Sequence, residues 1–299
     1  MQHLLKATII SACLFQPLIA SSQQEVDNGF IPVIEKPLFP QGKGPLILVD
    51  AAHFNFHTLE DKFAPFGKIA TGDGFRTASL TGKPDPGRLG EARILVIANA
   101  LHEKNTESWQ QPVHQAFSDE EIKTIRDWVW NGGRLFLIAD HMPFAGAVSG
   151  LAQELGYRFH DGFALKGPNR KFDLFSTGNG MLRPAELLSL HGPLDSIVSF
   201  TGQAFEIPDS AVSVMQFDST YKVLLPEVAW EFSRETKMIP AGGLSQLAYG
   251  KFGKGRVVVA GEAAMFTAQR VGDMKFGLNN PMARHNVTLL RNILEWLNG

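Results

Sequence analysis

The stretch 118–146, "SDEEIKTIRDWVWNGGRLFLIADHMPFAG", contains a helix signal, a turn and an apolar strand in succession. Ser118, followed three residues later by an acid, predicts a capping box at the start of a helix, and Gly132-Gly133 predicts its end. The apolar strand that comes next breaks abruptly into Asp140-His141. A helix leading closely into a buried strand is typical of an α/β fold. The acid and the imidazole at the end of that strand are candidates for chemistry.

Four short apolar runs recur along the chain, and none alternates polar with apolar residues. They are LILV (46–49), ILVIA (94–98), LFLIA (135–139) and VVVA (257–260). Runs that are apolar on both faces are typical of parallel strands covered by helices on each side. Because helical patterns lie between these runs, the sequence predicts an α/β fold with a doubly wound, mostly parallel sheet and helices on both faces.

The remaining segments predict additions to that sheet. Residues 244–261 predict a β-hairpin that turns near Gly253-Lys254-Gly255. Residues 160–240 contain scattered Gly and Pro and short β-like pieces, which indicates an insertion. We therefore expect one domain over residues 45–299, preceded by a polar leader over residues 23–44.

The composition favours a globular protein that does not bind nucleic acid. Of the 299 residues, 44% are hydrophobic and 19% are charged, and the formal net charge is -2. Nucleic-acid binding depends on clustered Lys and Arg that neutralise phosphates, and the sequence contains no such run. Neither composition nor spacing predicts an oligomeric state.

Residues 1–22 predict a signal peptide. Their apolar stretch, 7–20, is shorter than the roughly 20 apolar residues that a transmembrane helix needs. Ala20 and Ser22 stand at the positions that signal peptidase reads, so we expect cleavage directly afterwards and a periplasmic or secreted protein. A lipoprotein anchored through Cys13 is the less favoured alternative, because the residues after Cys13 are apolar instead of forming a flexible polar tether.

Cys13 is the only cysteine in the chain. Removal of the signal peptide would leave none, which excludes disulfides, thiolate metal ligands and a cysteine nucleophile from the mature protein. Candidate chemistry therefore rests on His, Asp, Glu and Asn side chains.

Each apolar run is followed closely by polar side chains. These are Asp50, Asn99, Asp140-His141 and Glu262. In an open parallel sheet, ligands bind in the crevice outside the carboxyl ends of the strands, so these side chains are expected to face one crevice. The alternative is that strands simply end at the surface, where polar residues are common.

Three polar residues alternate after the first run: His53, Asn55 and His57. An extended backbone would point all three to the same side. With Asp50 beside them, His53 and His57 could hold a divalent metal such as zinc, which is the cofactor that this pattern suggests. The same side chains could instead hydrogen-bond a polyhydroxyl ligand, or the segment could cap the next helix through Thr58.

Several segments resemble a domain family of unknown function, DUF4350, and the related class I glutamine amidotransferase-like superfamily. They are "VDAAHFNFHTLEDKFAPF", "WVWNGGRLFLIADHMPF", "GKGRVVVAGEAAMF" and "NPMARHNVTLLRNILEWL". The resemblance implies a flavodoxin-like sheet and puts the superfamily's nucleophile elbow at Asp140-His141. The superfamily's cysteine is missing, and the region of its catalytic His and Glu offers only Glu262. The resemblance therefore implies the fold without thiolate acyl transfer.

Two functions remain open. The first is a hydrolase that uses acid–base or metal-assisted chemistry on a small polar molecule or glycan. Asp140, His141 and Glu262 would be catalytic, with His141 as a base oriented by Asp140 or Asp50, and Asp50, His53, Asn55, His57 and Asn99 would bind substrate. The second is a non-catalytic binding or scaffolding module, with aromatic residues such as Trp109 on its partner surface.

Overall fold

The computed structural model describes residues 24–167 and 172–299. The expected signal peptide, including Cys13, lies outside the described residues. The largest sheet has the strand order β3-β2-β4-β5-β15-β14-β10-β6, and β11 also pairs with β14. Its strands are β2 (Leu46–Asp50), β3 (Arg76–Leu80), β4 (Ile94–Ala98), β5 (Arg134–Ile138), β6 (Arg158–Phe159), β10 (Phe205–Glu206), β11 (Ala211–Gln216), β14 (Ser245–Phe252) and β15 (Gly255–Ala260).

Only part of this sheet is parallel. Strands β3, β2, β4, β5 and β15 run parallel, whereas the pairings of β14, β10, β6 and β11 are antiparallel. A mixed α/β class is confirmed, but the expectation of a mostly parallel sheet holds only from β3 to β15. The expected hairpin is the cause of the change, because its tight turn at Gly253-Lys254 joins β14 to β15 and can connect only antiparallel strands.

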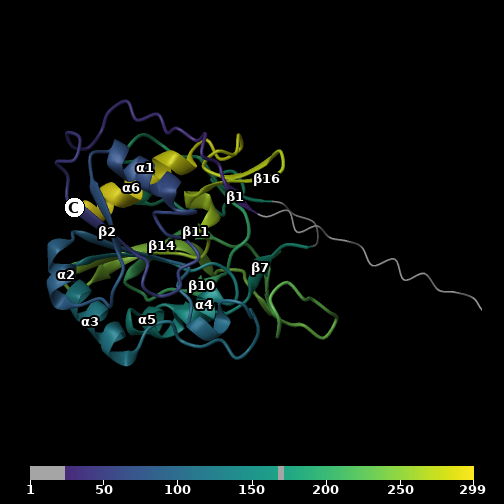
Figure 1. Cartoon of the computed structure of the whole chain (residues 1–299). Coiled ribbons are helices and arrows are strands. Elements are labelled where there is room, and N and C mark those ends of the chain that lie inside the picture. The colour runs from purple at the N-terminus through teal and green to yellow at the C-terminus, as the bar shows by residue number, and fades with distance from the viewer. Residues whose placement is uncertain (1–23, 168–171) are drawn as a thin grey trace, which may run out of the picture.

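Helices cover the sheet on two sides, α1 and α6 on one and α2, α3 and α5 on the other (Figure 1). The helices are α1 (Ala64–Gly72), α2 (Pro86–Glu91), α3 (Asp119–Trp130), α4 (Phe144–Ala147), α5 (Ser149–Glu154) and α6 (Asn286–Asn298), with 3₁₀ helices η1 (Glu103–Asn105), η2 (Glu186–Leu188) and η3 (Ala264–Phe266). Helix α3 begins with the expected capping box, in which Ser118 and Glu121 bond each other's backbone amides.

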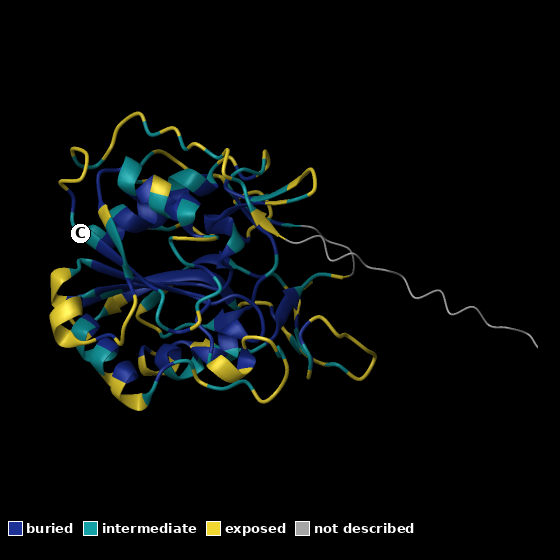
Figure 2. Ribbon diagram, in the orientation of Figure 1, coloured by how far each residue is buried: buried dark blue, intermediate teal, exposed yellow. Residues whose placement is uncertain are grey.

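The two-sided cover explains why the strands read as unbroken apolar runs. In β2, Ile47 and Val49 pack into the core beneath α1 and α6, whereas Leu48 packs into the core formed with α3 and α5. All residues of β4 and β5 are buried, and Figure 2 shows these central strands enclosed between the helices. Alternate side chains are therefore buried away from water on opposite faces of the same sheet. This burial of apolar surface stabilises both layers.

Smaller sheets lie around the main one. They are β1 (Glu25–Val26) with β16 (Ala268–Val271) and β17 (Met274–Gly277); β7 (Phe163–Leu165) with β12 (Lys222–Leu225) and β13 (Lys237–Pro240); and β8 (Asp173–Ser176) with β9 (Ser196–Ser199). Strands from the expected insertion, 160–240, thus join both the main sheet and the small ones. Within the described ranges, no helix is both long and apolar enough to cross a membrane.

Candidate functional site

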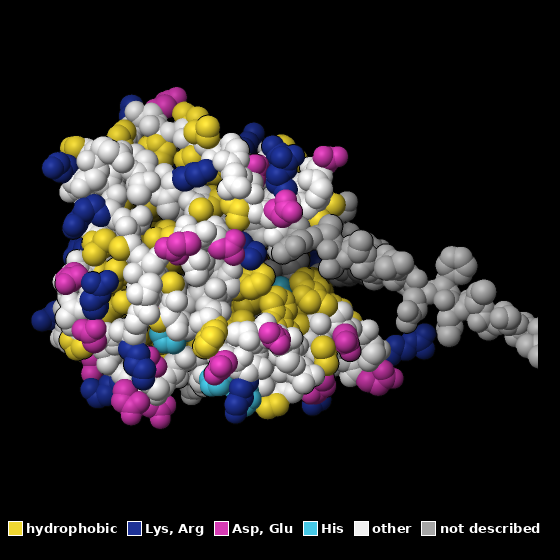
Figure 3. Space-filling model, in the orientation of Figure 1, with side chains coloured by type: hydrophobic (Ala, Val, Ile, Leu, Met, Phe, Trp, Pro, Cys, Tyr) yellow, Lys and Arg dark blue, Asp and Glu magenta, His cyan; other side chains and the backbone are white. Residues whose placement is uncertain are grey.

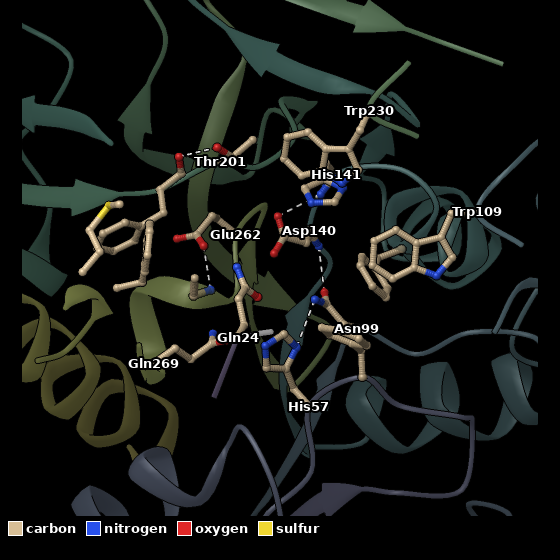
Figure 4. A pocket seen from close by; sticks show the side chains of 16 residues that line it. Gln24, His57, Asn99, Trp109, Asp140, His141, Thr201, Trp230, Glu262 and Gln269 are labelled. Atoms are coloured by element: carbon tan, nitrogen blue, oxygen red, sulfur yellow. Dashed lines mark hydrogen bonds between the residues drawn. The ribbon is translucent and has the colours of Figure 1, made fainter. Parts of the chain in front are cut away.

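A cavity of about 530 Å³ lies at the carboxyl ends of β4, β5 and β15. Asn99, Asp140, His141 and Glu262, which follow those strands, all line it, and Figure 4 shows them around one space. His57 lines it too. Five of the eight candidate residues are therefore brought together, whereas Asp50, His53 and Asn55 do not line the cavity.

Asn99 joins the end of β5 to His57 through both ends of its side-chain amide. Its Oδ1 accepts a hydrogen bond from the backbone amide of Asp140 at 2.9 Å, and its Nδ2 lies 3.1 Å from Nδ1 of His57. The first bond requires an oxygen at that position, so the other end is the NH₂ group and donates to His57. Nδ1 of His57 is therefore an acceptor, and the neutral ring carries its proton on Nε2.

His57 is held neutral in this environment. The residue is 3% exposed, and burial, aided by the charge of Lys62, lowers its pKa to about 3. Its Nε2 is buried and has no hydrogen-bond partner in the described part of the chain. A buried donor without a partner costs free energy, so this N–H on the cavity wall is available to a ligand.

Asp140 and Glu262 are two buried carboxyl groups on the same cavity, with exposed fractions of 7% and 0%. Burial raises the pKa of Glu262 well above its usual range, and the charge of Asp140 raises it further. Burial also raises the pKa of Asp140. The two groups thus titrate as a pair, and we assign their shared proton to Glu262 because it is the more deeply buried.

Backbone amides act against protonation of Glu262. The amides of Ala264 and Met265 donate to its two oxygens at 2.6 and 2.9 Å, and such bonds favour the carboxylate. Burial and the neighbouring charge outweigh them, since the carboxyl is fully removed from water and faces a second carboxyl. These bonds also fix the orientation of Glu262 at the start of η3.

His141 presents one nitrogen that no described residue occupies. Its Nδ1 lies 2.7 Å from the carbonyl oxygen of Met142 and donates to it, so Nε2 carries the lone pair of the neutral ring. Burial lowers the pKa of His141, although the charge of Asp140 works in the other direction. A neutral imidazole with an open Nε2 can accept a proton or a hydrogen bond from a ligand.

The orientation of His141 differs from the sequence-based expectation that Asp140 or Asp50 would hold it. Asp140 accepts a bond from the backbone amide of His141, not from its ring. The ring is instead stacked on Phe163, with centroids 4.4 Å apart, and meets the edge of Trp230 at 4.6 Å. Aromatic packing and the Met142 carbonyl therefore position it.

Asp50, His53 and Asn55 form a separate cluster, in which Asp50 and His53 are buried and Asn55 is half-buried. Both oxygens of Asp50 lie 2.9 Å from Nδ1 of His53, and Asn55 donates to Asp50 at 3.0 Å. Nε2 of His53 lies 3.3 Å from Glu121, which ties this loop to the start of α3. The contacts support a structural role and leave no side of this imidazole free for a ligand.

The backbone explains why the alternation of His53, Asn55 and His57 was misleading. The prediction assumed an extended segment, but Phe54 has a left-handed φ of 44° and the chain turns there. Side chains on either side of such a turn no longer point the same way. His53 consequently packs inward against Phe117, whereas His57 reaches the cavity.

The proposed pair of metal ligands is not brought together by this geometry. His53 is engaged at both ring nitrogens by carboxylates, and His57 accepts from Asn99. Among residues 24–167 and 172–299, no three His, Cys, Asp or Glu side chains converge as a metal-binding group. Zinc binding through His53 and His57 therefore lacks the shared geometry that it requires.

The pKa values of the two imidazoles are expected to shift in opposite directions from 6.5. Burial disfavours a charged His53, but bonds and charges from Asp50 and Glu121 outweigh it and raise its pKa above 6.5. The linked stabilisation is complete below pH 6.5 and is lost as pH rises through the raised pKa. His57 should stay neutral down to about pH 3. NMR titration of the ring nitrogens measures both, and joint titration near 6.5 would contradict the assignment.

Three non-glycine residues in the described chain have a left-handed φ, and two of them line the cavity. Asn99 has φ 47° and Trp230 has φ 69°; the third is Phe54. Such conformations cost free energy and cluster at functional sites, where surrounding contacts maintain them. Asn99, not Asp140, is therefore the strained residue at a strand end.

Sequence reasoning missed part of the cavity wall. Gln24 comes from the leader, Gln269 from β16 and Trp230 from the loop between β12 and β13. Trp109, expected on a partner surface, also lines the cavity. No local pattern marks these residues, because the loops that present them are brought together only by the tertiary fold.

Comparison with known proteins shows similarity of fold alone. No protein-family model and no curated protein matches the chain. The chain is similar to the mmIFT52 N-terminal domain, with TM-score 0.61 and 14% identity over 85% of this chain and 97% of that domain. It is also similar to cytoplasmic protein STM1381 of Salmonella typhimurium LT2, with TM-score 0.52 and 12% identity over 84% and 98% of the two chains.

A third similar structure is a ThuA-like protein from Bacteroides uniformis, with TM-score 0.49 and 12% identity over 89% of this chain and 94% of that chain. Neither the mmIFT52 N-terminal domain nor STM1381 is named as a class I glutamine amidotransferase-like or DUF4350 protein, and no family model matches the chain. The family suggested by the sequence segments is therefore wrong. Apolar strands that end in polar residues recur in many α/β folds. Such segments therefore indicate an arrangement of strands and do not identify a family.

Proposed function

We propose that the cavity binds a small polar molecule or glycan and hydrolyses it by acid–base chemistry. The observation that carries the proposal is the buried pair of Asp140 and Glu262 on one cavity, where burial and mutual charge raise the pKa of Glu262. Groups with raised pKa values in a cleft are candidates for proton transfer, and paired carboxyls with different protonation are suited to acid and base roles.

The proposed reaction conserves atoms and protons. Glu262 donates its proton to the leaving oxygen, or to the leaving nitrogen of an anilide, as the bond from carbon to that atom breaks. Water forms the new bond to carbon and gives a proton to Asp140, so the pair again holds one proton. Exchange with solvent returns the proton to Glu262. Nε2 of His141 accepts a hydrogen bond from the substrate or the water, because its Nδ1 is committed to Met142.

The proposal takes the sheet as doubly wound, with its ligand at the carboxyl ends of the strands. It also takes the protein as periplasmic or secreted, since residues 1–22 predict a signal peptide. The substrate would then be a molecule met outside the cytoplasm. A metal is not needed for this chemistry, because the acid and the base are both supplied by carboxyl groups.

A panel of p-nitrophenyl glycosides, p-nitrophenyl acetate and aminoacyl p-nitroanilides tests this proposal. Wild-type protein is expected to hydrolyse at least one class, and Asp140→Asn to lose that activity because an amide cannot take the proton from water. Released p-nitrophenol or p-nitroaniline measures the rate. Equal turnover by wild type and Asp140→Asn, or no turnover by the wild type, counts against the proposal.

One observation favours a non-catalytic binding module as a second candidate. The two oxygens of Glu262 accept from the amides of Ala264 and Met265, as expected for a carboxylate that stabilises a turn. In that case Glu262 would remain ionised and would position η3 on the cavity wall. Ligand binding without turnover by the wild type would support this candidate.

A further inference from the structure

The cavity has two chemically different walls. Gln24, His57 and Gln269 lie on one side, and His141, Trp109 and Trp230 lie on the other, with the two carboxyl groups between them (Figure 4). The polar side chains of the first wall, here called the polar wall, come from the leader, the loop after β2 and β16. The second wall is aromatic. A ligand that fits must satisfy both.

Besides the exposed amide of Gln24, the polar wall offers one buried donor and one buried acceptor, each without a partner in the described chain. The donor is Nε2 of His57, and the acceptor is Oε1 of Gln269, which is 2% exposed. The orientation of Gln269 follows from its other end, because Nε2 donates to the hydroxyl of Thr267 at 2.7 Å. The cavity wall thus contains one buried donor and one buried acceptor that a ligand could pair with.

The kind of partner follows from the donor–acceptor inventory. A hydroxyl group both donates and accepts, so hydroxyls can satisfy His57 and Gln269 together. An ammonium only donates and would leave the N–H of His57 unpaired, whereas a carboxylate or phosphate only accepts and would leave Gln269 unpaired. The polar wall therefore selects neutral hydroxyl-bearing ligands.

Charge around the cavity points the same way. Asp140 and Glu262 both line the cavity, and none of the other described residues that line it is Lys or Arg. An anionic ligand would meet these carboxyl groups with no compensating cation, and like charges in a buried site are unfavourable.

The aromatic wall suits a flat apolar face. Trp230 is 51% exposed, and its ring meets His141 at 4.6 Å and Phe163 at 4.7 Å, while Trp109 packs on Phe144 at 5.1 Å. Figure 3 shows hydrophobic side chains gathered beside the end of β7 on the visible face. Indole rings combine an apolar face with a wet edge, which matches a pyranose ring with C–H groups on one face and hydroxyls at its rim.

We propose that the cavity is a subsite for a neutral pyranose, with its hydroxyls bound by His57 and Gln269 and its apolar face against Trp109 and Trp230. This substrate class rests on the proposed function, since the carboxyl pair then lies beside the bonds of the bound sugar. The tautomer of His57, set through Asn99, makes it a hydrogen-bond donor and not a base.

Binding is tested by calorimetry on the full chain carrying Glu262→Gln, which slows turnover and keeps the charge of Asp140 in the cavity. The probes are methyl α- and β-glycosides of glucose, galactose and mannose, together with glucuronic acid. At least one neutral glycoside is expected to bind at least tenfold more tightly than glucuronic acid, because Asp140 lines the cavity and no Lys or Arg among the described residues does. Gln269→Met, which removes the acceptor at similar size, should weaken that binding about fivefold to tenfold, as for the loss of one hydrogen bond.

Gln246→Met is the matched control. Gln246 is 1% exposed and its Oε1 also lacks a partner in the described chain, but it does not line the cavity. This variant should bind the sugar normally. Equal weakening by both variants, no weakening by Gln269→Met, or preference for a charged sugar would overturn the subsite.

The outcomes separate the substrate class from the reaction. If no neutral glycoside binds while the wild type still hydrolyses an ester or an anilide, the subsite is overturned and the acid–base proposal stands. If glycosides bind as expected but nothing is hydrolysed, the subsite stands and the reaction is overturned.

Discussion

Glu262→Gln is expected to lower kcat/KM by about 10²- to 10⁴-fold, the range for losing a general acid. The substitution keeps the size of the side chain but removes the proton that burial and the charge of Asp140 favour there by raising the pKa of Glu262. Substrate binding should change less than turnover, because the missing interaction develops only in the transition state. Initial rates over a range of substrate concentrations separate the two effects.

The leaving group distinguishes a proton donor from a residue that only shapes the wall. A good leaving group needs little protonation, so Glu262→Gln should lose less activity on an activated aryl substrate than on its alkyl counterpart. A uniform loss on both would contradict the acid role. The matched control is Asp161→Asn, since burial raises the pKa of Asp161 to about 6 but it lies outside the residues that line the cavity. Its activity should stay near that of the wild type.

Asp50→Ala is expected to destabilise the fold by about 3–5 kcal/mol, the range for removing one partner of a buried ion pair. Asp50 is 1% exposed and accepts from His53 and Asn55, so its loss removes a partner of the buried His53 ring and of the half-buried Asn55 amide. Denaturant unfolding monitored by circular dichroism gives the free energy. Activity per folded molecule should persist, because this cluster does not line the cavity.

Asp127→Ala provides the contrast on the surface. Asp127 pairs with Lys123 and Arg126 in an exposed position, and such pairs contribute little to stability. Similar midpoints for Asp50→Ala and the wild type would show that the buried cluster is dispensable. Loss of activity in fully folded Asp50→Ala would show that Asp50 contributes to the function of the cavity, although it does not line it.

The sequence anticipated the meeting of Asn99, Asp140 and Glu262 for a clear physical reason. Each follows a parallel strand, and the register pairs Ala98 with Ile138 and Ile138 with Ala260, so the three strands end at nearly the same level. Strand identity and register are local consequences of the apolar runs. The same reasoning failed for Asp50.

Register also explains that failure. Val49 pairs with Val96, so the next residue, Asp50, lies level with the interior of β4 and below Asn99. A difference of two residues in where the strands end moves a polar side chain from the crevice into the sheet. The apolar run alone did not carry that information, because the length of each run is similar while its alignment depends on the neighbouring strand.

The aromatic and polar walls were beyond sequence reasoning. Trp230 belongs to the loop between β12 and β13, and its approach to His141 depends on contacts such as the bond from the amide of Ala229 to the carbonyl of Trp109. Gln269 reaches the cavity through β16, far along the chain from Asn99. Contacts between distant segments are set by packing, and no periodic pattern encodes them.

Patterns within the chain determined the mixed α/β class, the capped helix before β5, the hairpin of β14 and β15, and the polar groups at three strand ends. Those features follow from hydrophobic periodicity and turn chemistry, which act over a few neighbouring residues. Tertiary structure decided which histidine faces the cavity, which carboxyl retains a proton and which side chains await a ligand. Burial and long-range contacts set these properties, because the environment of a side chain depends on segments that meet only in the folded protein.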